Sequence, residues 1–263
     1  MKKYFVIGNP IDHSLSPKLH NYWIKENNIN AVYDKKQLNE SGLAEIVEEI
    51  KKDKINGINV TIPLKKSVIP FLDELTPLAS EARSVNTIFK KDGKVFGDNT
   101  DVGGFKQSLK HINYDVKNKK VFILGAGGVV SSIILALRKL EVSKIYLSNR
   151  TKEKAEQLKK NYSYIEIIDW GEITNFDIII NATSLGLKSD DQIKLDFGKI
   201  GNDKLFYDVI YNPSKTNFLL KGEKLGNKIN NGKMMFIYQA HQAFTIWHKL
   251  MPIIDDEVIK LIE

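Results

Sequence analysis

A buried strand that ends in a glycine turn lies near the middle of the chain and constrains its fold more than any other feature. The apolar run 121–124 is followed by Gly125, Gly127 and Gly128, where the pattern changes to that of a helix. Tight turning and close approach of the backbone to a diphosphate both require residues without a Cβ, and the helix N-terminus then faces the phosphate charge. The sequence therefore predicts a nucleotide-binding site near the middle of the chain. The residues that precede this site must serve a different function.

A basic residue after the second strand of this pattern favours NADP over NAD. Asn149-Arg150-Thr151 stands where an NAD site carries Asp or Glu for the ribose 2′-hydroxyl. An Arg there suggests a 2′-phosphate, with Lys154 one helical turn further on as a second donor and Thr151 as a helix cap. The third glycine of the usual fingerprint is replaced by Val130. The alternatives are a glycine turn without a ligand and a solvated Arg150.

The composition is that of an ordinary globular protein. Of 263 residues, 27% are charged and 42% are hydrophobic, enough for one large domain or two modest ones. The net charge is +7, but only three of the 39 basic residues are Arg, and the Lys residues are spread along the chain. A nucleic-acid surface would cluster its charge and favour Arg, so we expect no nucleic-acid partner.

The absence of Cys and of long apolar stretches narrows the chemistry further. Without Cys the chain has no disulfide, thiolate nucleophile or Cys-ligated metal, which is compatible with a reducing cytoplasm. The five His lack metal-ligand spacing, so no metal is expected, and His20 and His241 are interpreted as packing or hydrogen-bonding residues. No stretch approaches the ~20 apolar residues of a membrane span, and no signal pattern is present. We therefore expect a cytoplasmic protein without a membrane partner.

Strand-like and helix-like segments alternate along the chain. In the first part we expect strands at 2–7, 32–33, 58–62, 84–89 and 94–97, the last two as a hairpin, and helices at 16–27, 43–51 and 101–111. The polar stretch 113–119 is expected to link it to a second part, with strands at 121–124, 144–148, 164–168, 177–181 and 205–210 and helices at 128–140 and 152–160. The pattern predicts an α/β protein whose second part is a doubly wound parallel sheet. Helices at 234–250 and after Pro252 could close either part.

Polar residues gather at the end of the predicted strand 58–62. Asn59 and Thr61 are two residues apart and point to the same face of a strand, at the end where ligands of α/β proteins collect. Pro63 ends the strand, and Lys65 is expected in the first turn of the next helix, whose positive N-terminus would favour the neutral amine. A neutral amine suits proton transfer. The alternative is one more surface Lys in a Lys-rich chain.

Two further stretches combine capping residues with groups that could bind a ligand. Asp98 and Asp101 lie in one glycine-containing loop, and Asp101 begins a predicted helix; the alternative is that Thr100 or Asp101 caps this helix. Ser16 and Pro17 have the pattern of an N-cap followed by proline at the first helical position. Ser14 has no such capping role, and we interpret it as a ligand-binding residue.

Taken in order, these motifs resemble those of the shikimate dehydrogenase family. The resemblance spans nearly the whole chain, and the joint order of the motifs is far more specific than any one of them. It rests on Ser14-Leu15-Ser16-Pro17 with His20-Asn21, Asn59 through Lys65, Ser84-Val85-Asn86-Thr87, Gly97 through Asp101, the glycine turn, Asn149-Arg150-Thr151, Asn181-Ala182-Thr183-Ser184, Asp208 through Pro213, and Gly232 through Gln239. The chain departs from the family at Val129-Val130-Ser131-Ser132, where small residues and a basic one are usual, and at Lys154, which replaces a common Arg.

The resemblance implies NADPH-dependent reduction of 3-dehydroshikimate to shikimate in aromatic amino-acid biosynthesis. It makes Lys65 the proton donor, with Asp101 as its hydrogen-bonded partner. Ser14, Ser16 and Tyr211 would hold the substrate carboxylate, and Asn59, Thr61, Asn86, Asp101 and Gln239 would bind the ring hydroxyls. The cofactor-binding residues would be Gly125, Ala126, Gly127, Gly128, Val129, Asn149, Arg150, Thr151, Lys154 and Gly232.

The same resemblance implies two domains. Residues 1–101 and 235–263 would form an α/β substrate-binding and catalytic domain, and residues 102–234 an NADP-binding Rossmann domain. The last helices would return to the first domain, so that Gln239 reaches a substrate held in the cleft between the domains. The expected partners are the small-molecule substrate and cofactor, and the chain is expected to be a monomer or a homodimer.

Three other interpretations stay open. A quinate/shikimate dehydrogenase of the same family would use NAD as readily as NADP, although Ser14, Ser16 and Arg150 disfavour it. A methylene-tetrahydrofolate dehydrogenase shares the broad architecture but would need a different context for its Lys. A non-catalytic NADP-sensing module would leave Lys65 and Asp101 without a role.

Overall fold

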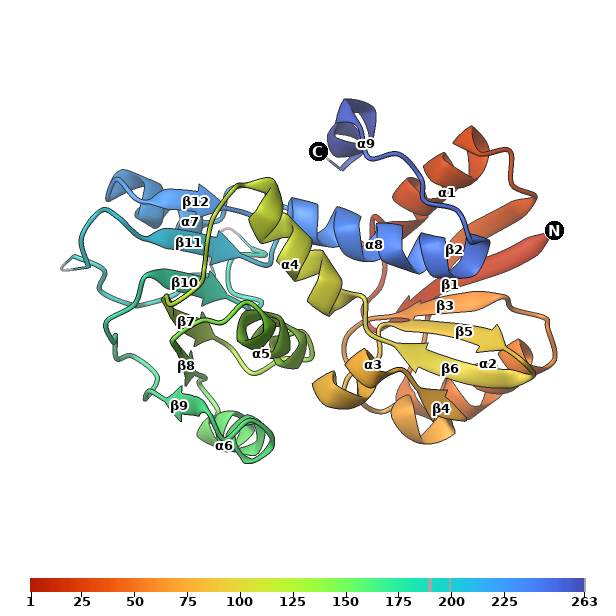
Figure 1. Ribbon diagram of the computed structural model, residues 1–263, viewed down its shortest axis with the longest axis horizontal. Helices are drawn as coiled ribbons and strands as arrows, with labels where there is room; N and C mark the ends of the chain where they lie inside the picture. The colour runs from red at the N-terminus through yellow and green to blue at the C-terminus, as the bar shows by residue number, and fades with distance from the viewer. Residues whose placement is uncertain (189–190, 199, 263) are drawn as a thin grey trace. The chain divides into compact units, whose positions relative to one another are not determined.

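The computed structural model describes residues 1–188, 191–198 and 200–262, and it divides into two compact units (Figure 1). One unit contains residues 1–105 with 237–262, and the other contains residues 106–236. The boundaries fall inside helices α4 (Asp101–His111) and α8 (Lys233–His248), and not in the polar stretch 113–119. The division into functional domains at 101/102 and 234/235 stays a prediction, and residues 189, 190, 199 and 263 within those ranges lie outside the described residues.

The first unit is built on a mixed sheet of six strands. Its order is β2-β1-β3-β5-β6-β4, with β1, β2 and β3 parallel and the hairpin of β5 and β6 antiparallel. Asp92 and Gly93 both have positive φ at the turn of that hairpin, as predicted for Asp-Gly. The strands are β1 (Lys2–Gly8), β2 (Ala31–Gln37), β3 (Gly57–Val60), β4 (Glu74–Leu75), β5 (Thr87–Lys91) and β6 (Lys94–Asp98).

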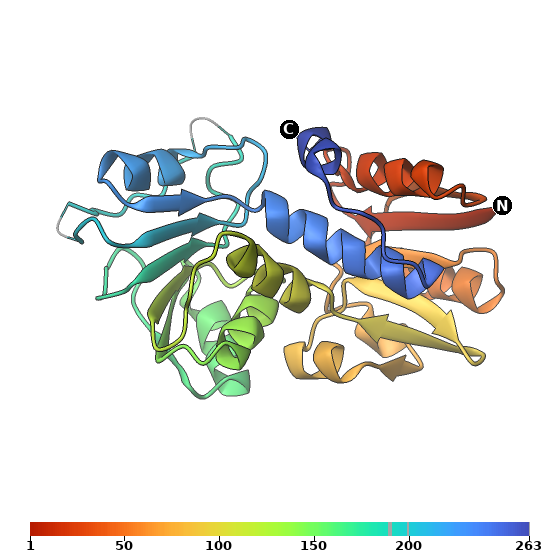
Figure 2. The ribbon, with the colours of Figure 1, turned by 45° about the horizontal axis from the view of Figure 1, so that its top comes forward.

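Side-chain alternation along β1 and β3 separates the two faces of this sheet. Ile7 and Ile58 pack with α2 (Leu43–Lys51), whose buried residues recur at helical spacing. Because successive residues of a strand point to opposite faces, Tyr4 and Asn59 face the side of α1 (Ser16–Glu26) and α8. Figure 2 shows α2 and α8 on opposite faces of the sheet. The side chain of Asn59 therefore lies on the aromatic face of the sheet and not in the aliphatic core.

The C-terminal helix α8 packs tightly on the first sheet, as the family resemblance implied. Trp247 lies against Gly57, where a Cβ would stand 2.3 Å from the indole nitrogen. That nitrogen donates a hydrogen bond to the carbonyl of Ile88 at 3.0 Å. A residue larger than glycine at position 57 would displace the indole, so Gly57 fixes the height of α8 above the sheet.

The second unit contains a parallel six-stranded sheet of the dinucleotide-binding kind. Its order is β12-β11-β10-β7-β8-β9, which read along the chain is the doubly wound order with its reversal between β7 and β10. The strands are β7 (Lys120–Leu124), β8 (Lys144–Ser148), β9 (Ile165–Ile167), β10 (Ile178–Asn181), β11 (Leu205–Asp208) and β12 (Lys228–Asn230). The predicted α/β fold class with a Rossmann-type second part is confirmed.

Helices cover both faces of this second sheet. The pair α5 (Val130–Lys139) and α6 (Lys152–Asn161) lies on one side and α7 (Asn217–Lys224) on the other (Figure 2). Phe206 and Phe218 anchor the α7 side in an aromatic cluster, with ring centroids 5.1 Å apart. Among the described residues, no helix has both the length and the apolarity needed to cross a membrane.

Several short elements were not predicted from the sequence. They are the 3-10 helices η1 (Glu40–Gly42) and η2 (Ile69–Phe71), the strands β4 and β12, and the helices α3 (Pro77–Ala82) and α7. The short helix after Pro252 is confirmed as α9 (Asp256–Leu261), capped by Asp255. Short elements carry too few periodic residues to stand out from turns.

Candidate functional site

Lys65 and Asp101 form a buried ion pair in the first unit. Lys65 Nζ lies 2.5 Å from Asp101 Oδ2, and the two side chains expose only 11% and 7% of their surfaces. Asp101 is the first residue of α4, and the N–H of Val102 in the same turn donates to Asn99 Oδ1 and not to Asp101. The carboxylate of Asp101 is thus available to orient the amine. An ammonium held by a carboxylate in this way can donate a proton to a ligand.

The side chain of Asn86 connects this pair to its surroundings. Its Nδ2 donates to Asp101 Oδ1 and Thr100 Oγ1, both at 2.9 Å, and lies 3.4 Å from Gln239 Oε1. Its Oδ1 accepts the backbone N–H of Thr100 at 2.7 Å. Asn86, Thr100 and Asp101 are all nearly fully buried, so the polar groups of this network are paired with one another away from solvent. The predicted residues Lys65, Asn86, Asp101 and Gln239 therefore form one cluster.

The helix predicted to start at Lys65 is not formed. Residues 62–68 form successive turns, followed only by η2. Pro63 and Pro70 bracket this segment, and the residue before a proline is disfavoured in helical conformation, so too little chain remains for an α-helix. The prediction that a helix N-terminus favours the neutral amine is wrong. Instead, Asp101 and the hydrogen bond from Val85 N–H to the Lys65 carbonyl, at 2.8 Å, position this residue.

Asn59 lies on the aromatic face of the sheet, and both ends of its side-chain amide are hydrogen-bonded. Its Nδ2 donates to the carbonyl of Asn86 at 3.1 Å and to Thr87 Oγ1 at 3.2 Å. Its Oδ1 accepts a hydrogen bond from the hydroxyl of Tyr33 at 2.7 Å. Thr61 comes one residue after the end of β3 and is half-buried. Tyr33 could not be predicted as a site residue, because its contact with Asn59 depends on the pairing of β1 with both β2 and β3.

The two serines near α1 exchange the local roles predicted for them. The helix begins at Ser16 itself, and no side-chain bond caps it. Ser14 Oγ accepts the N–H of Ser16 at 3.3 Å, so Ser14 makes the local bond that was expected of Ser16. The side chain of Ser16 is instead buried and interacts with the phenol of Tyr33. The predicted cap is wrong because the helix starts one residue earlier than its proline pattern indicated.

In the second unit, the glycine turn has the shape that a dinucleotide requires. Gly125 has φ +110°, and a Cβ there would stand 2.7 Å from the carbonyl oxygen of Ala182, so only glycine fits. Gly127 is exposed, and the nearest atom to a Cβ placed on it is 3.9 Å away. Gly127 thus leaves an open backbone surface just before α5. This turn lies at the reversal between β7 and β10, where doubly wound sheets bind dinucleotides.

The neighbouring residues of the glycine turn fit the same ligand. Val130, at the third glycine position, is fully buried in the first turn of α5, so the bulky residue is accommodated inside the unit. Arg150 and Lys154 are exposed at the start of α6. Thr151 precedes that helix without a side-chain cap bond, which corrects its predicted capping role. Asn149 Nδ2 donates to the carbonyl of Thr151 at 2.7 Å and holds the turn.

Two predicted site residues of the second unit have structural contacts of their own. Gly232 permits close packing, because a Cβ there would stand 2.1 Å from the carbonyl oxygen of Val209. Tyr211 stacks on Phe236 with ring centroids 4.6 Å apart. Gly232 therefore has a packing reason for being glycine that is independent of a cofactor.

Asp208 is a buried carboxylate that the sequence did not single out by role. It accepts hydrogen bonds from Asn181 Nδ2 at 3.1 Å, Ile210 N–H at 2.9 Å and Thr216 Oγ1 at 2.6 Å. Asn181 Nδ2 also donates to the carbonyl of Leu185 at 3.0 Å. Burial raises the pKa of Asp208 to about 6. The motifs 181–184 and 208–213 are thus tied together by one polar cluster at the ends of β10 and β11.

We expect Asp208→Asn to lower the free energy of unfolding by about 1–3 kcal/mol, because an amide nitrogen would face hydrogen-bond donors in a buried cluster. Thermal unfolding checks this, with the exposed Asp203→Asn as the matched control. Because the folded-state pKa of Asp208 is raised above that of the unfolded chain, its deprotonation lowers wild-type stability as pH rises from about 4 to 6. The Asn variant should lack that pH-dependent component. Equal melting temperatures for both variants would contradict the role of the cluster.

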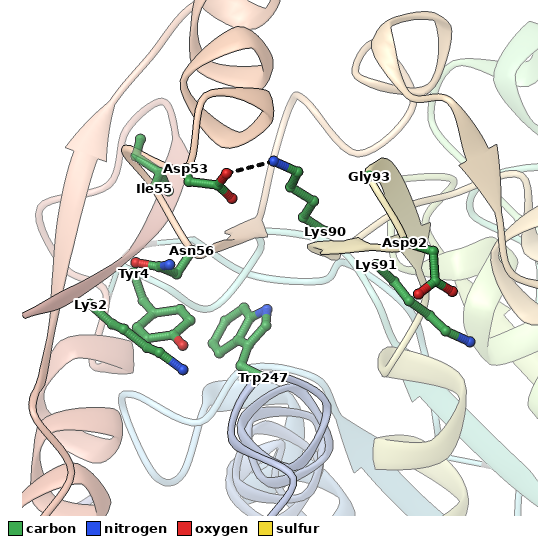
Figure 3. Close-up of a pocket in the computed structure, with 10 residues that line it drawn as sticks. All are labelled: Lys2, Tyr4, Asp53, Ile55, Asn56, Lys90, Lys91, Asp92, Gly93 and Trp247. Atoms are coloured by element: carbon green, nitrogen blue, oxygen red, sulfur yellow. Dashed lines mark hydrogen bonds and ion pairs between the residues drawn. The ribbon is translucent and has the colours of Figure 1, made fainter.

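A surface hollow in the first unit is separate from the predicted site. It has a volume of about 500 Å³, and Figure 3 shows Lys90 reaching across to Asp53, 2.7 Å away. None of the predicted site residues lines it. Its lining residues are Lys2, Tyr4, Asp53, Ile55, Asn56, Lys90, Lys91, Asp92, Gly93 and Trp247. The described part of the chain contains no group of His, Asp or Glu residues arranged to hold a metal ion.

Comparisons with known proteins match this arrangement over the full chain. The sequence-family model of the shikimate dehydrogenase substrate binding domain matches residues 6–88, and the family model of shikimate/quinate 5-dehydrogenase matches residues 107–189. A shikimate dehydrogenase (NADP(+)) of Pelagibacter ubique is 60% identical, with 100% of each chain covered. The crystal structure of shikimate dehydrogenase from Aquifex aeolicus has a TM-score of 0.91 at 38% identity, covering 100% of this chain and 97% of that one. The Thermus thermophilus shikimate 5-dehydrogenase in complex with NADP(H) and shikimate has a TM-score of 0.90 at 28% identity, covering 100% and 98%.

Proposed function

The chain belongs to the shikimate dehydrogenase family, and from this premise we propose how its residues carry out the NADP-dependent reduction of 3-dehydroshikimate to shikimate. The observation that carries the proposal is the buried pair of Lys65 and Asp101, 2.5 Å apart. It supplies a proton donor and a group that orients it, in a cluster with Asn86 and Gln239. Such a constellation serves reversible proton transfer at a carbonyl or hydroxyl group.

In the proposed mechanism, Lys65 Nζ donates the proton that the carbonyl oxygen of the substrate takes up. NADPH, when bound, supplies the hydride to the carbonyl carbon. In the reverse direction the amine of Lys65 accepts the proton of the substrate hydroxyl. Asp101 holds Nζ in place through Oδ2, while its Oδ1 is fixed by Asn86. The reduction requires Lys65 to be protonated, because the ammonium is the form that donates.

The remaining predicted residues would bind and orient the substrate. Ser14 and Ser16 carry hydroxyls that can donate to its carboxylate, with Tyr211 as a third donor. The hydroxyls on the ring would be bound by Asn59, Thr61, Asn86, Asp101 and Gln239. Each of these side chains can accept a hydrogen bond from a hydroxyl group, and this matches a polyhydroxylated ring acid.

The glycine turn and the start of α6 are the proposed cofactor-binding segments. Gly125 to Val129 and the N-terminus of α5 would bind the diphosphate, because the open backbone at Gly127 offers N–H groups. Asn149, Arg150, Thr151 and Lys154 would bind the adenosine end with its 2′-phosphate. We propose that the enzyme acts in the cytoplasm. We also propose that it is a monomer or a homodimer, and light scattering of the purified protein measures its oligomeric state.

Initial rates with shikimate and quinate, each paired with NADP and NAD, test the proposed function. We expect the highest kcat/KM for shikimate with NADP. Comparable rates with quinate and NAD would instead identify a quinate/shikimate dehydrogenase. If folded protein binds NADP but turns over neither acid, the chain is a sensing module, and the proposed catalytic role of Lys65 falls.

Replacing Arg150 with Ala is expected to reduce kcat/KM about 10- to 100-fold with NADP and to leave the value with NAD nearly unchanged, because only NADP carries the 2′-phosphate. Arg83→Ala, at an Arg of the first unit, is the control and should leave the ratio of the two values unchanged. Equal losses with both cofactors would contradict the assignment of Arg150 to the 2′-phosphate.

A further inference from the structure

The phenol of Tyr33 lies between two of the proposed substrate-binding residues. Its hydroxyl donates to Asn59 Oδ1 at 2.7 Å, and the side chain of Ser16 interacts with the same phenol. The Tyr33 side chain is buried, with 2% of its surface exposed, and Asn59 and Ser16 are each 6% exposed. One buried hydroxyl therefore connects a residue proposed to bind the carboxylate with a residue proposed to bind the ring hydroxyls.

The motif His20-Asn21 braces Tyr33 from two directions. The ring of His20 stacks on that of Tyr33, with centroids 4.2 Å apart and planes at 2°. Asn21 forms a pair of hydrogen bonds with the Tyr33 backbone, accepting from its N–H at 2.9 Å and donating to its carbonyl at 2.7 Å. Ring and backbone are thus both fixed by α1. From the sequence, His20 and Asn21 were only part of a family motif without an assigned role. The structure shows that both contact Tyr33.

His20 acts in this stack as a neutral aromatic ring. Burial lowers its pKa to about 3, and neither ring nitrogen has a hydrogen-bond partner among the described residues. Besides Tyr33, the ring contacts Trp23 at 5.9 Å and Trp247 at 5.5 Å between centroids. A buried imidazole without hydrogen-bond partners costs free energy, and its main contact is the stack on Tyr33, so we interpret His20 as a packing residue that positions Tyr33.

We propose that Tyr33 is a positioning residue that fixes the side chains of Asn59 and Ser16 in the orientation that binds the substrate, and that His20 and Asn21 hold Tyr33 for this purpose. The inference rests on the proposed substrate roles of Asn59 and Ser16. It adds a residue that lies behind them, on β2, and that needs no contact with the substrate.

The direction of the hydrogen bonds gives this arrangement a definite polarity. Because Asn59 Nδ2 donates to Asn86 and Thr87, its Oδ1 must be the atom that faces Tyr33. The single proton of the phenol goes to that oxygen, so the hydroxyl of Ser16 can act toward Tyr33 only as a donor. Burial raises the pKa of Tyr33 well above its usual value, which keeps the phenol protonated. A bound substrate carboxylate would compete with Tyr33 for the proton of Ser16.

Steady-state kinetics of Tyr33→Phe test the proposal, because this change removes the hydroxyl and keeps the stacked ring. We expect the KM for shikimate to rise about 5- to 20-fold, as for loss of a buried hydrogen bond, with kcat changed less and the KM for NADP unchanged. The matched control is Tyr4→Phe, which removes a phenol hydroxyl from the same face of the sheet at the hollow of Figure 3. The control should change neither KM. Equal increases in both KM values, or a fall in melting temperature without a change in KM, would overturn the proposal.

A double-mutant cycle shows whether Tyr33 acts through Asn59. In the Asn59→Ala background the effect of Tyr33→Phe on the KM for shikimate should shrink to about 2-fold, because only Ser16 remains to be oriented. Full additivity would contradict the positioning role. If Asn59→Ala and Ser16→Ala raise the KM but Tyr33→Phe does not, only this inference fails. If neither Asn59→Ala nor Ser16→Ala raises the KM for shikimate, the proposed substrate site fails as well.

Discussion

Lys65→Ala is expected to lower kcat by about 10²- to 10⁴-fold, the usual range for loss of a general acid or base, with a smaller change in the KM for shikimate. The physical reason is that no second ammonium is held at the Asp101 carboxylate, which pairs with Lys65 alone among the described residues. Without Nζ, the carbonyl oxygen would have to take its proton from water. Initial rates in both directions of the reaction measure the loss.

The neighbouring Lys66 provides a matched control for this prediction. Lys66 is exposed on the same run of turns, so Lys66→Ala removes an equal charge without touching the ion pair. We expect its kcat to stay within about 2-fold of the wild type, as is usual for surface substitutions. A kcat close to normal in Lys65→Ala would remove this residue from the mechanism, whatever the effect on KM.

Much of the architecture was predictable because its signals are local. The length of the apolar run and the spacing of the glycines at 121–140 predict a strand, a turn and a helix of the second unit. The hairpin at Asp92-Gly93 was predictable because this dipeptide favours the positive φ angles of a tight turn. The Trp247 contact that returns α8 to the first unit was not local. It depends on the absence of a side chain at Gly57, nearly two hundred residues away in the chain, and periodicity alone could not decide it.

For the site, the sequence identified chemical groups better than their local environments. Lys65 and Asp101 were named correctly as neighbours through the resemblance, but the helix expected at Lys65 is a series of turns between two prolines. Tyr33 was missed because a tyrosine on a short strand looks like a core residue until the order β2-β1-β3 places it near Asn59. Such contacts arise from strand pairing, and one sequence contains no direct record of register.

Asp101→Ala is expected to be more damaging than a loss of catalysis alone. It leaves the buried Lys65 ammonium without its partner and removes an acceptor from Asn86 Nδ2. Breaking a buried ion pair on one side typically costs about 3–5 kcal/mol of stability, since the remaining charge is desolvated and unpaired. We expect a markedly lower melting temperature together with a kcat reduced at least about 100-fold. Asp98→Ala, in the same loop, removes a carboxylate that contacts Thr76 and not Lys65, and should retain most of the activity.

The double variant Lys65→Met/Asp101→Leu separates the structural role of the pair from its chemical one. Apolar replacements of both partners of a buried ion pair are often neutral or stabilising, because no charge is left to desolvate. The melting temperature should therefore recover toward the wild-type value, whereas kcat should stay at the level of Lys65→Ala. Asn86 Nδ2 keeps Thr100 Oγ1 as an acceptor, so the rest of the cluster can persist. If stability does not recover, the unpaired charge is not what destabilises Asp101→Ala, and if activity recovers, proton transfer does not pass through Lys65.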